Sequence, residues 1–202
     1  MKFCLTVCFY AALVFAGTAF SMVPIQAIDV DGKTLVLNAQ GRVTVVLYSN
    51  QSVQDDTRAA GRSLDDFQGL ENFRNIVVVD LRGSLANWAS GYTQRRMVRD
   101  LDKEAERIRP SYLKNGSRRD PRLDVCAVAD FKGDTCLKLG WQTTSETMRV
   151  IVFDAGGGEV QRWENIKDYR PLQQLLGRLL GKKIDSSKTS LKHTTSSGRQ
   201  TV

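Results

Sequence analysis

Two short and almost wholly apolar runs constrain the fold of this chain more than any other feature. They are VTVVLYS at residues 43–49 and NIVVVDL at residues 75–81. Runs of this length and character predict strands that are covered on both faces, as in a parallel sheet. A helix is predicted between them, over residues 52–67, because apolar side chains recur there on one face. A buried strand, a helix and a second buried strand are the unit from which parallel sheets are built.

The rest of the chain extends this α/β pattern. Turn residues before residue 34 predict a β-hairpin ahead of the first buried strand. A second helix is expected over residues 93–108, and two prolines and a glycine then predict a loop over residues 109–122. The remaining elements are expected to be a strand, a short helix, a β-hairpin around a glycine-rich turn, and a last helix, in residues 123–130, 131–141, 148–163 and 170–181. The order predicts a mixed sheet in which the closing hairpin adds an antiparallel edge.

The amino-terminal segment is typical of a secretory signal peptide. Lys2 precedes an uncharged apolar run that ends in small residues, so residues 1–27 are interpreted as a signal, cleaved after Ser21 or Ala27. We therefore expect an exported protein, periplasmic or extracellular. A retained membrane anchor is the alternative, because no charge occurs between Lys2 and Asp29 and the stretch is long enough to span a bilayer.

The net charge of +7 is unevenly distributed. The tail at residues 182–202, rich in Ser, Thr and Lys, carries a net charge of four, and Lys2 carries one more. The tail has no apolar periodicity, and we expect it to be disordered. The region between the signal and the tail is therefore only mildly basic.

Three blocks of sequence resemble those of a known superfamily. They are VDGKTLVLNAQGRVTVVLYSN, VADFKGDTCLKLGW and RVIVFDAGGGEVQRW, and they occur in this order. Together they resemble thioredoxin-like proteins of the peroxiredoxin and periplasmic thiol-disulfide oxidoreductase type. The resemblance covers most of residues 28–181 and implies a thioredoxin-like domain there. It implies a three-layer α/β/α fold with a mixed central sheet and an N-terminal β-hairpin.

The resemblance does not extend to the redox motif of that superfamily. Its active members carry reactive cysteines where the first long helix begins, and the helix dipole there favours the thiolate. In this chain the corresponding positions carry the polar residues Asn50, Gln51, Ser52 and Asp55. Met148 replaces the proline expected before the closing hairpin. The one histidine, His193, lies in the tail. We therefore expect no dithiol exchange at this place and interpret Ser52 and Asp55 as a capping box. A polar hydrogen-bonding pocket is the alternative.

Cys126 and Cys136 are the cysteines that follow the signal segment. In an exported protein such a pair favours a structural disulfide. Two buried free thiols and a displaced redox pair are the alternatives that stay open.

A basic segment provides a further candidate site. Its cationic residues are Arg109, Lys114, Arg118, Arg119 and Arg122. Such a loop can bind an acidic partner, a polyanion or an anionic lipid surface, or it can simply be solvated. Only Tyr112 is interspersed among these charges, which argues against a single-stranded nucleic acid as the partner.

These observations favour a non-catalytic binding or structural module over an enzyme. The ligand is then an unknown protein or peptide, and we expect no nucleic acid, metal or cofactor. Two alternatives remain. One is a thiol-disulfide or peroxidase-type redox protein that uses Cys126 and Cys136. The other is an envelope adaptor that binds an acidic partner through the basic segment.

Overall fold

A mixed five-stranded sheet forms the centre of the computed structural model, which describes residues 23–82, 84 and 90–182. Its strands are β3 (Val43–Ser49), β4 (Phe73–Asp80), β5 (Cys126–Asp130), β6 (Val150–Phe153) and β7 (Glu159–Trp163). The strand order is β5-β4-β3-β6-β7, with β3, β4 and β5 parallel and β6 and β7 antiparallel to their neighbours. Every residue of β3 is buried, so the first apolar run does mark a strand covered on both faces. The second run forms β4, in which buried and half-buried residues alternate along most of the strand.

One face of this sheet is covered by the amino-terminal hairpin and a short helix. The hairpin consists of β1 (Gln26–Ile28) and β2 (Thr34–Val36), which form a separate two-stranded sheet. Its apolar side chains pack with those of the sheet and of α3 (Asp134–Lys138) in one cluster. The predicted N-terminal hairpin is confirmed.

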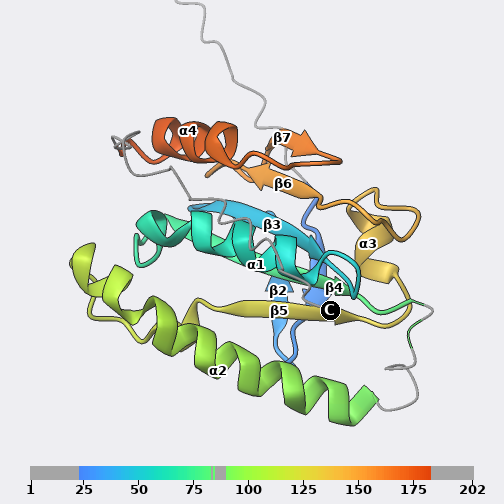
Figure 1. Ribbon diagram of the computed structural model, residues 1–202. Coiled ribbons are helices and arrows are strands. Elements are labelled where there is room, and N and C mark those ends of the chain that lie inside the picture. Colours follow the sequence, from blue (N-terminus) through green and yellow to red (C-terminus); the bar gives the residue numbers. More distant parts are fainter. Residues whose placement is uncertain (1–22, 83, 85–89, 183–202) are drawn as a thin grey trace, which may run out of the picture.

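The opposite face is covered by two longer helices. Ala60 and Leu64, in and just after α1 (Gln54–Ser63), pack there with Leu172 and Leu176 of α4 (Arg170–Leu179). The layers of Figure 1 therefore follow the order hairpin and α3, sheet, α1 and α4. This arrangement confirms the predicted three-layer α/β/α fold with a mixed sheet.

Helix α2 (Ser90–Lys114) is longer than predicted and contains Pro110. It runs beside β5 (Figure 1), and its residues Ile108 and Tyr112 are buried on either side of the proline. The expected loop is therefore shorter, and the expected helix end at residue 108 is wrong. Burial of the two large side chains outweighs the local signal of the proline, which by itself favours a helix end.

The predictions for the two ends of the chain concern residues that lie largely outside the described part of the structure. The signal segment to residue 22, the cleavage site after Ser21 and the tail from residue 183 belong to this part. Ala27, the alternative cleavage position, is the central residue of β1 and is buried. Among the helices that the structure describes, none is both long and apolar enough to cross a membrane.

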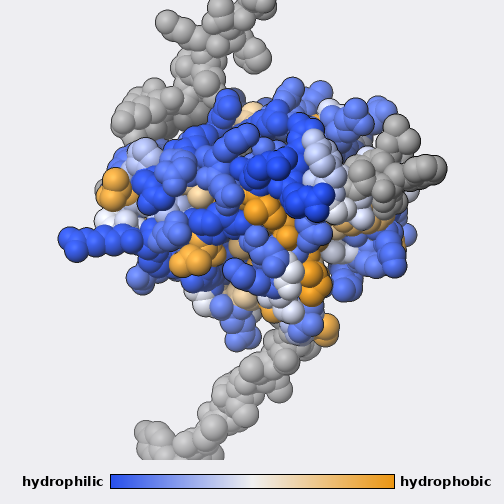
Figure 2. All heavy atoms as spheres, turned by 90° about the horizontal axis from the view of Figure 1, so that it is seen from below, coloured by the Kyte–Doolittle hydropathy of each residue, from blue (hydrophilic) through white to orange (hydrophobic). Residues whose placement is uncertain are grey.

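The surface seen from below in Figure 2 is mostly hydrophilic, with hydrophobic side chains in smaller patches. On the described surface, the large apolar residues that are most exposed are Val23, Leu123, Leu113, Ile28 and Tyr92. They come from the amino terminus, the hairpin, α2 and the turn after it.

Candidate functional site

The junction between β3 and α1 is held by Asn50. Its Oδ1 accepts hydrogen bonds from the backbone N–H groups of Ser52 (2.9 Å) and Val53 (3.1 Å). The side chain of Ser52 makes no capping bond to the helix, and Asp55 pairs instead with Arg58 at 2.9 Å. The predicted capping box is therefore wrong: Val53 is the N-cap residue and has no side-chain cap, and Asn50 instead caps the turn that leads into α1, because a short asparagine side chain reaches the backbone two and three residues ahead. Gln51, Ser52 and Asp55 are exposed.

The other end of the Asn50 side chain reaches a buried tyrosine. Asn50 Nδ2 donates to the hydroxyl oxygen of Tyr48 (3.1 Å) and to the carbonyl oxygen of Ser145 (2.7 Å). The Tyr48 hydroxyl also accepts from the Ser145 N–H (2.9 Å) and donates to Asp80 Oδ2 (3.0 Å). Burial, the largest cause, raises the pKa of Tyr48 to about 12, so this hydroxyl stays protonated and can donate.

Asp80, at the end of β4, joins this network to an arginine. Arg82 donates to both carboxylate oxygens, with Nη2 at 2.8 Å from Oδ2 and Nε at 2.9 Å from Oδ1. Burial by itself would raise the pKa of Asp80, but the hydrogen bonds from Arg82 and Tyr48 outweigh it and lower the pKa below its usual value. The remaining Arg82 N–H groups bind the carbonyl oxygens of Trp141 and Gln142. The Asp80–Arg82 pair therefore connects β4 to the loop before β6.

Aromatic and apolar side chains fill the space around the Tyr48 ring. Trp141 packs edge-on at 5.4 Å between ring centroids, and the Arg149 guanidinium lies 5.5 Å above the ring. Met148 is buried against α1, where Thr57 Oγ1 lies 3.5 Å from its sulfur. The predicted position of Met148, facing the start of the first long helix, therefore matches the geometry. A substrate would have to displace these side chains to reach the interior.

The two cysteines are free thiols on different elements. Cys126 begins β5 and is half-buried, and Cys136 lies in α3 and is fully buried. Burial is the largest cause that raises the pKa of each thiol, and nearby carboxylates raise the pKa of Cys136 further. Of the three alternatives, the geometry favours buried free thiols, because a raised pKa disfavours the reactive thiolate.

The residues of the basic segment do not form one loop. Arg109 and Lys114 lie on α2, Arg118 and Arg119 follow it, and Arg122 lies in the turn η3 (Pro121–Leu123). Four of these five residues make ion pairs with carboxylates: Arg109 with Glu106, Lys114 with Asp66, Arg119 with Asp124, and Arg122 with both Asp31 and Asp102. Arg118 is exposed. Most of the cationic side chains of this segment are therefore already paired with carboxylates of the domain itself.

Arg122 has a structural role that its sequence context did not suggest. Its Nη2 lies 2.8 Å from Asp31 in the hairpin turn, and its Nε lies 2.7 Å from Asp102 on α2. The Val30 N–H also donates to the Ala127 carbonyl on the outer edge of β5. Arg122 thus helps to hold the hairpin against α2 and the sheet.

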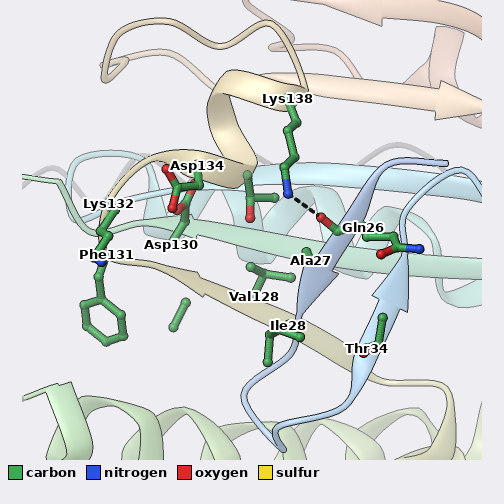
Figure 3. Close-up of a pocket in the computed structure, with 12 residues that line it drawn as sticks. Gln26, Ala27, Ile28, Thr34, Val128, Asp130, Phe131, Lys132, Asp134 and Lys138 are labelled. Carbon is green, nitrogen blue, oxygen red and sulfur yellow. Dashed lines mark hydrogen bonds between the residues drawn. The ribbon is translucent and has the colours of Figure 1, made fainter. Parts of the chain in front are cut away.

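A shallow hollow of about 450 Å³ lies between the hairpin, β5 and α3. Figure 3 shows Val128 at its centre, β1 on one side, and Phe131 and Lys132 on the other. Lys138 reaches across from α3 to the carbonyl oxygen of Gln26 at 2.9 Å. The hollow therefore combines apolar walls with two cationic side chains, those of Lys132 and Lys138, and two carboxylates, those of Asp130 and Asp134. Its residues come from four elements, and no local sequence signal pointed to it.

The fold and site can be compared with known proteins. Neither a protein-family model nor a curated protein sequence matches the chain. Among solved structures, a putative thioredoxin from Neisseria meningitidis is 14% identical, with a TM-score of 0.51 over 82% of this chain and 91% of that one. A secreted thiol-disulfide isomerase from Corynebacterium glutamicum is also 14% identical, with a TM-score of 0.51 over 79% and 85%. A DsbF homologue from Corynebacterium diphtheriae is 12% identical, with a TM-score of 0.50 over 77% and 84%.

These likenesses define the class of fold. The chain has the thioredoxin-like fold that was predicted from the three sequence blocks. At such low identities the likeness concerns the fold alone, so activity has to be argued from the residues of this chain.

The sequence prediction concerned the junction after β3, and it did not include Tyr48, Asp80 and Arg82, which the structure brings together there. The strands β3 and β4 are parallel neighbours, with Tyr48 opposite Val78 in the register. This pairing brings the side chain of Tyr48 close to those of Asp80 and Arg82. Polar residues at the ends of two buried strands were the available signal, since the carboxyl ends of parallel strands meet at one edge of the sheet.

Proposed function

We propose that this protein is an exported thioredoxin-like domain that lacks the Cys-x-x-Cys redox motif and acts as a non-catalytic binding or structural module. The observation that carries the proposal is the network of Asn50, Tyr48, Asp80 and Arg82. It occupies the edge of the sheet at which the first long helix begins, and it contains no thiol. Its donors and acceptors are paired with one another, which is typical of a network that stabilises the fold.

The redox alternative has weaker support. A reactive cysteine needs exposure and a lowered pKa. Cys136 is buried and the pKa values of both thiols are raised. The adaptor alternative is also less well supported, because most cations of the basic segment already pair with carboxylates of the domain.

Export is supported by the composition of the amino-terminal segment. The neighbour from Corynebacterium glutamicum is described as secreted, which is compatible with an exported domain of this fold. Cleavage after Ser21 would leave β1 complete, whereas cleavage after Ala27 would remove two of its three residues. We therefore favour the earlier position.

The hollow of Figure 3 is the surface that we propose for a protein or peptide ligand. It is concave, it has apolar walls at Val128 and at Ile28, which is 58% exposed, and Lys132 and Lys138 lie at its rim. A concave apolar surface with a few polar groups is typical of binding sites.

An insulin-reduction assay tests the non-catalytic part of the proposal. We expect the rate to equal the background without protein, because the start of α1 carries no cysteine. A thioredoxin assayed in parallel is the positive control. Turnover at a rate comparable with that control would overturn the proposal.

Thiol trapping with peptide mapping separates the redox alternative from this proposal. Under native conditions we expect an alkylating reagent to label Cys136 far more slowly than after denaturation, because the thiol is buried with a raised pKa. Treatment with an oxidant followed by mapping should yield no Cys126–Cys136 bridge. A bridge that forms and is reduced again under mild conditions would support the redox alternative instead.

A further inference from the structure

Three arginines gather around one carboxylate at the edge of the sheet where β3, β4 and β5 begin, on the left in Figure 1. Arg42 immediately precedes β3, Arg74 lies in β4, and Arg119 lies between α2 and η3. Arg42 Nη1 is 3.3 Å from Asp124 Oδ1, and Arg119 Nη2 is 2.9 Å from Asp124 Oδ2. Arg74 is close enough for its charge to interact with those of Arg42 and Asp124.

The positive charge of this cluster exceeds the negative charge. Among the described residues, Asp124 is the carboxylate that pairs with these arginines, and it also accepts a hydrogen bond from the Tyr112 hydroxyl at 2.9 Å. Cys126, which is adjacent to Arg74, adds no negative charge at neutral pH because burial raises the pKa of its thiol. Three guanidinium groups against one carboxylate leave an excess of two positive charges in a partly desolvated place.

Several N–H groups of the cluster also have no acceptor. Arg74 Nη2 donates to the carbonyl oxygen of Val36 at 2.6 Å, which fixes its guanidinium. The Nε of Arg74 and both Nε and Nη2 of Arg119 are buried, with no hydrogen-bond acceptor among the described residues. The short distance from Arg119 to Asp124 is therefore an ion pair without a well-aligned hydrogen bond. Buried donors without acceptors are rare in proteins and suggest that a group from outside completes them.

A hollow gives solvent access to Arg119. It has a volume of about 680 Å³ and is also lined by Ser117, by the cationic Arg118 and by the anionic Glu71. Glu71 and Arg118 are exposed, so both stay strongly solvated. Of the three arginines, Arg119 lines this hollow, whereas Arg74 lies deeper and is anchored to β2 through the Val36 carbonyl oxygen.

We propose that Arg42, Arg74 and Arg119 bind a small oxyanion of the phosphate type. The planar fork of an arginine matches two oxygens of a phosphate, and charge-assisted hydrogen bonds of this kind are among the strongest in proteins. A doubly charged phosphate also balances the excess charge, which a water molecule in the same place does not. The site lies at the end of the sheet opposite Asn50, so it is independent of the lost redox position.

The test is a titration of the full chain with inorganic phosphate, followed by calorimetry and by thermal unfolding. Sodium chloride at equal ionic strength is the control for screening. We expect saturable binding and a rise of the unfolding midpoint with phosphate only, because a ligand that binds the folded state stabilises it. An equal effect of chloride, or no saturation, would mean that water or simple screening satisfies the cluster, and the proposal would be wrong.

Substitutions locate the site. Arg42→Gln and Arg119→Gln are suited to this purpose, since their side chains are about one-third exposed (35% and 32%) and the variants are expected to fold. Each should weaken phosphate binding by about tenfold or more, the usual loss for a hydrogen bond to a charged group. Arg118→Gln is the matched control: it removes the same charge from an adjacent residue that lines the hollow but pairs with no carboxylate of the cluster, so it should weaken binding clearly less than Arg119→Gln. Equal affinities for Arg118→Gln and Arg119→Gln would contradict the proposal.

A gain of affinity provides a second readout. Glu71 lines the hollow, so Glu71→Gln removes a charge that repels an anion. We expect tighter phosphate binding for this variant. Weaker binding would show that the anion does not approach through this hollow, and it would count against the proposed site at Arg42, Arg74 and Arg119.

Discussion

At the scale of single residues, Asn50 connects the turn before α1 to the buried network around Tyr48. Its Oδ1 accepts from the N–H groups of that turn, and its Nδ2 binds the Tyr48 hydroxyl and the loop at Ser145. The carboxylate of Asp80 then extends the connection to Arg82. Asn50 therefore contributes to stability through both the turn and the buried network.

Asn50→Ala should therefore destabilise the domain much more than Ser52→Ala. We expect a loss of about 1–2 kcal/mol in the free energy of unfolding for Asn50→Ala, the usual cost of a lost cap with its neighbouring bonds. Ser52→Ala should change it by less than about 0.5 kcal/mol, because the Ser52 side chain is exposed and caps nothing. Urea unfolding of the two variants beside the wild type measures both values. A larger loss for Ser52→Ala would restore the capping box predicted from the sequence.

Part of this site can be predicted from the sequence, and part of it cannot. The place follows from the apolar run of β3 and the helical pattern after it, which are local signals. The partners of Tyr48 lie 32 and 97 residues away in the chain, and only the pairing of strands and the loop before β6 brings them together. A local pattern can therefore locate the junction, but the network around Tyr48 depends on long-range contacts.

At the scale of elements, α2 is the clearest case in which tertiary contacts override a local signal. Pro110 and the glycine after it favour a loop, yet the helix continues to Lys114. Tyr112 is buried and its hydroxyl binds Asp124 at 2.9 Å, while Ile108 packs in the same small cluster. The elements with strong apolar periodicity were predicted correctly, because there the local pattern and the tertiary contacts agree.

Pro110→Ala should stabilise the protein. A proline inside a helix has no N–H for the carbonyl oxygen four residues earlier, here that of Glu106, and its ring crowds that carbonyl. We expect a gain of about 1–3 kcal/mol in the free energy of unfolding, measured by urea denaturation. The matched control is Pro171→Ala in the first turn of α4, where a proline is well tolerated, so the change should stay below about 0.5 kcal/mol. No gain for Pro110→Ala would indicate that the surrounding backbone has already adapted to the proline.

At the scale of the whole molecule, the two ends of the sheet differ in their chemistry. The end at which β3 and β4 finish is closed by paired polar groups and by the rings of Tyr48 and Trp141. The end at which they begin carries the arginine cluster around Asp124. Buried donors without an acceptor among the described residues occur at both ends, on Arg74 and Arg119 at this end and on Trp141 and Arg149 at the other. If the fold has kept the geometry of its redox-active neighbours, a thiol pair placed at the start of α1 should regain reactivity.

The double substitution Ser52→Cys and Asp55→Cys tests this statement. The two positions are exposed, lie three residues apart at the amino-terminal end of α1, and have the spacing of a Cys-x-x-Cys motif. Because the free N–H groups and dipole of a helix start favour a thiolate, we expect the thiol at position 52 to titrate below the usual pKa of about 8.5. The variant should reduce insulin measurably, though more slowly than a thioredoxin, since Met148 occupies the position at which the resemblance to thioredoxin-like proteins implies a proline.

The matched control places the same pair in the middle of a helix. Arg96→Cys with Arg99→Cys on α2 has the same spacing and similar exposure but no helix start nearby. Its thiols should titrate near the ordinary value, and its activity should remain at background. Equal pKa values for the two variants would show that the start of α1 no longer activates a thiol. In that case the scaffold, and not only its cysteines, would have diverged from the redox proteins of this fold.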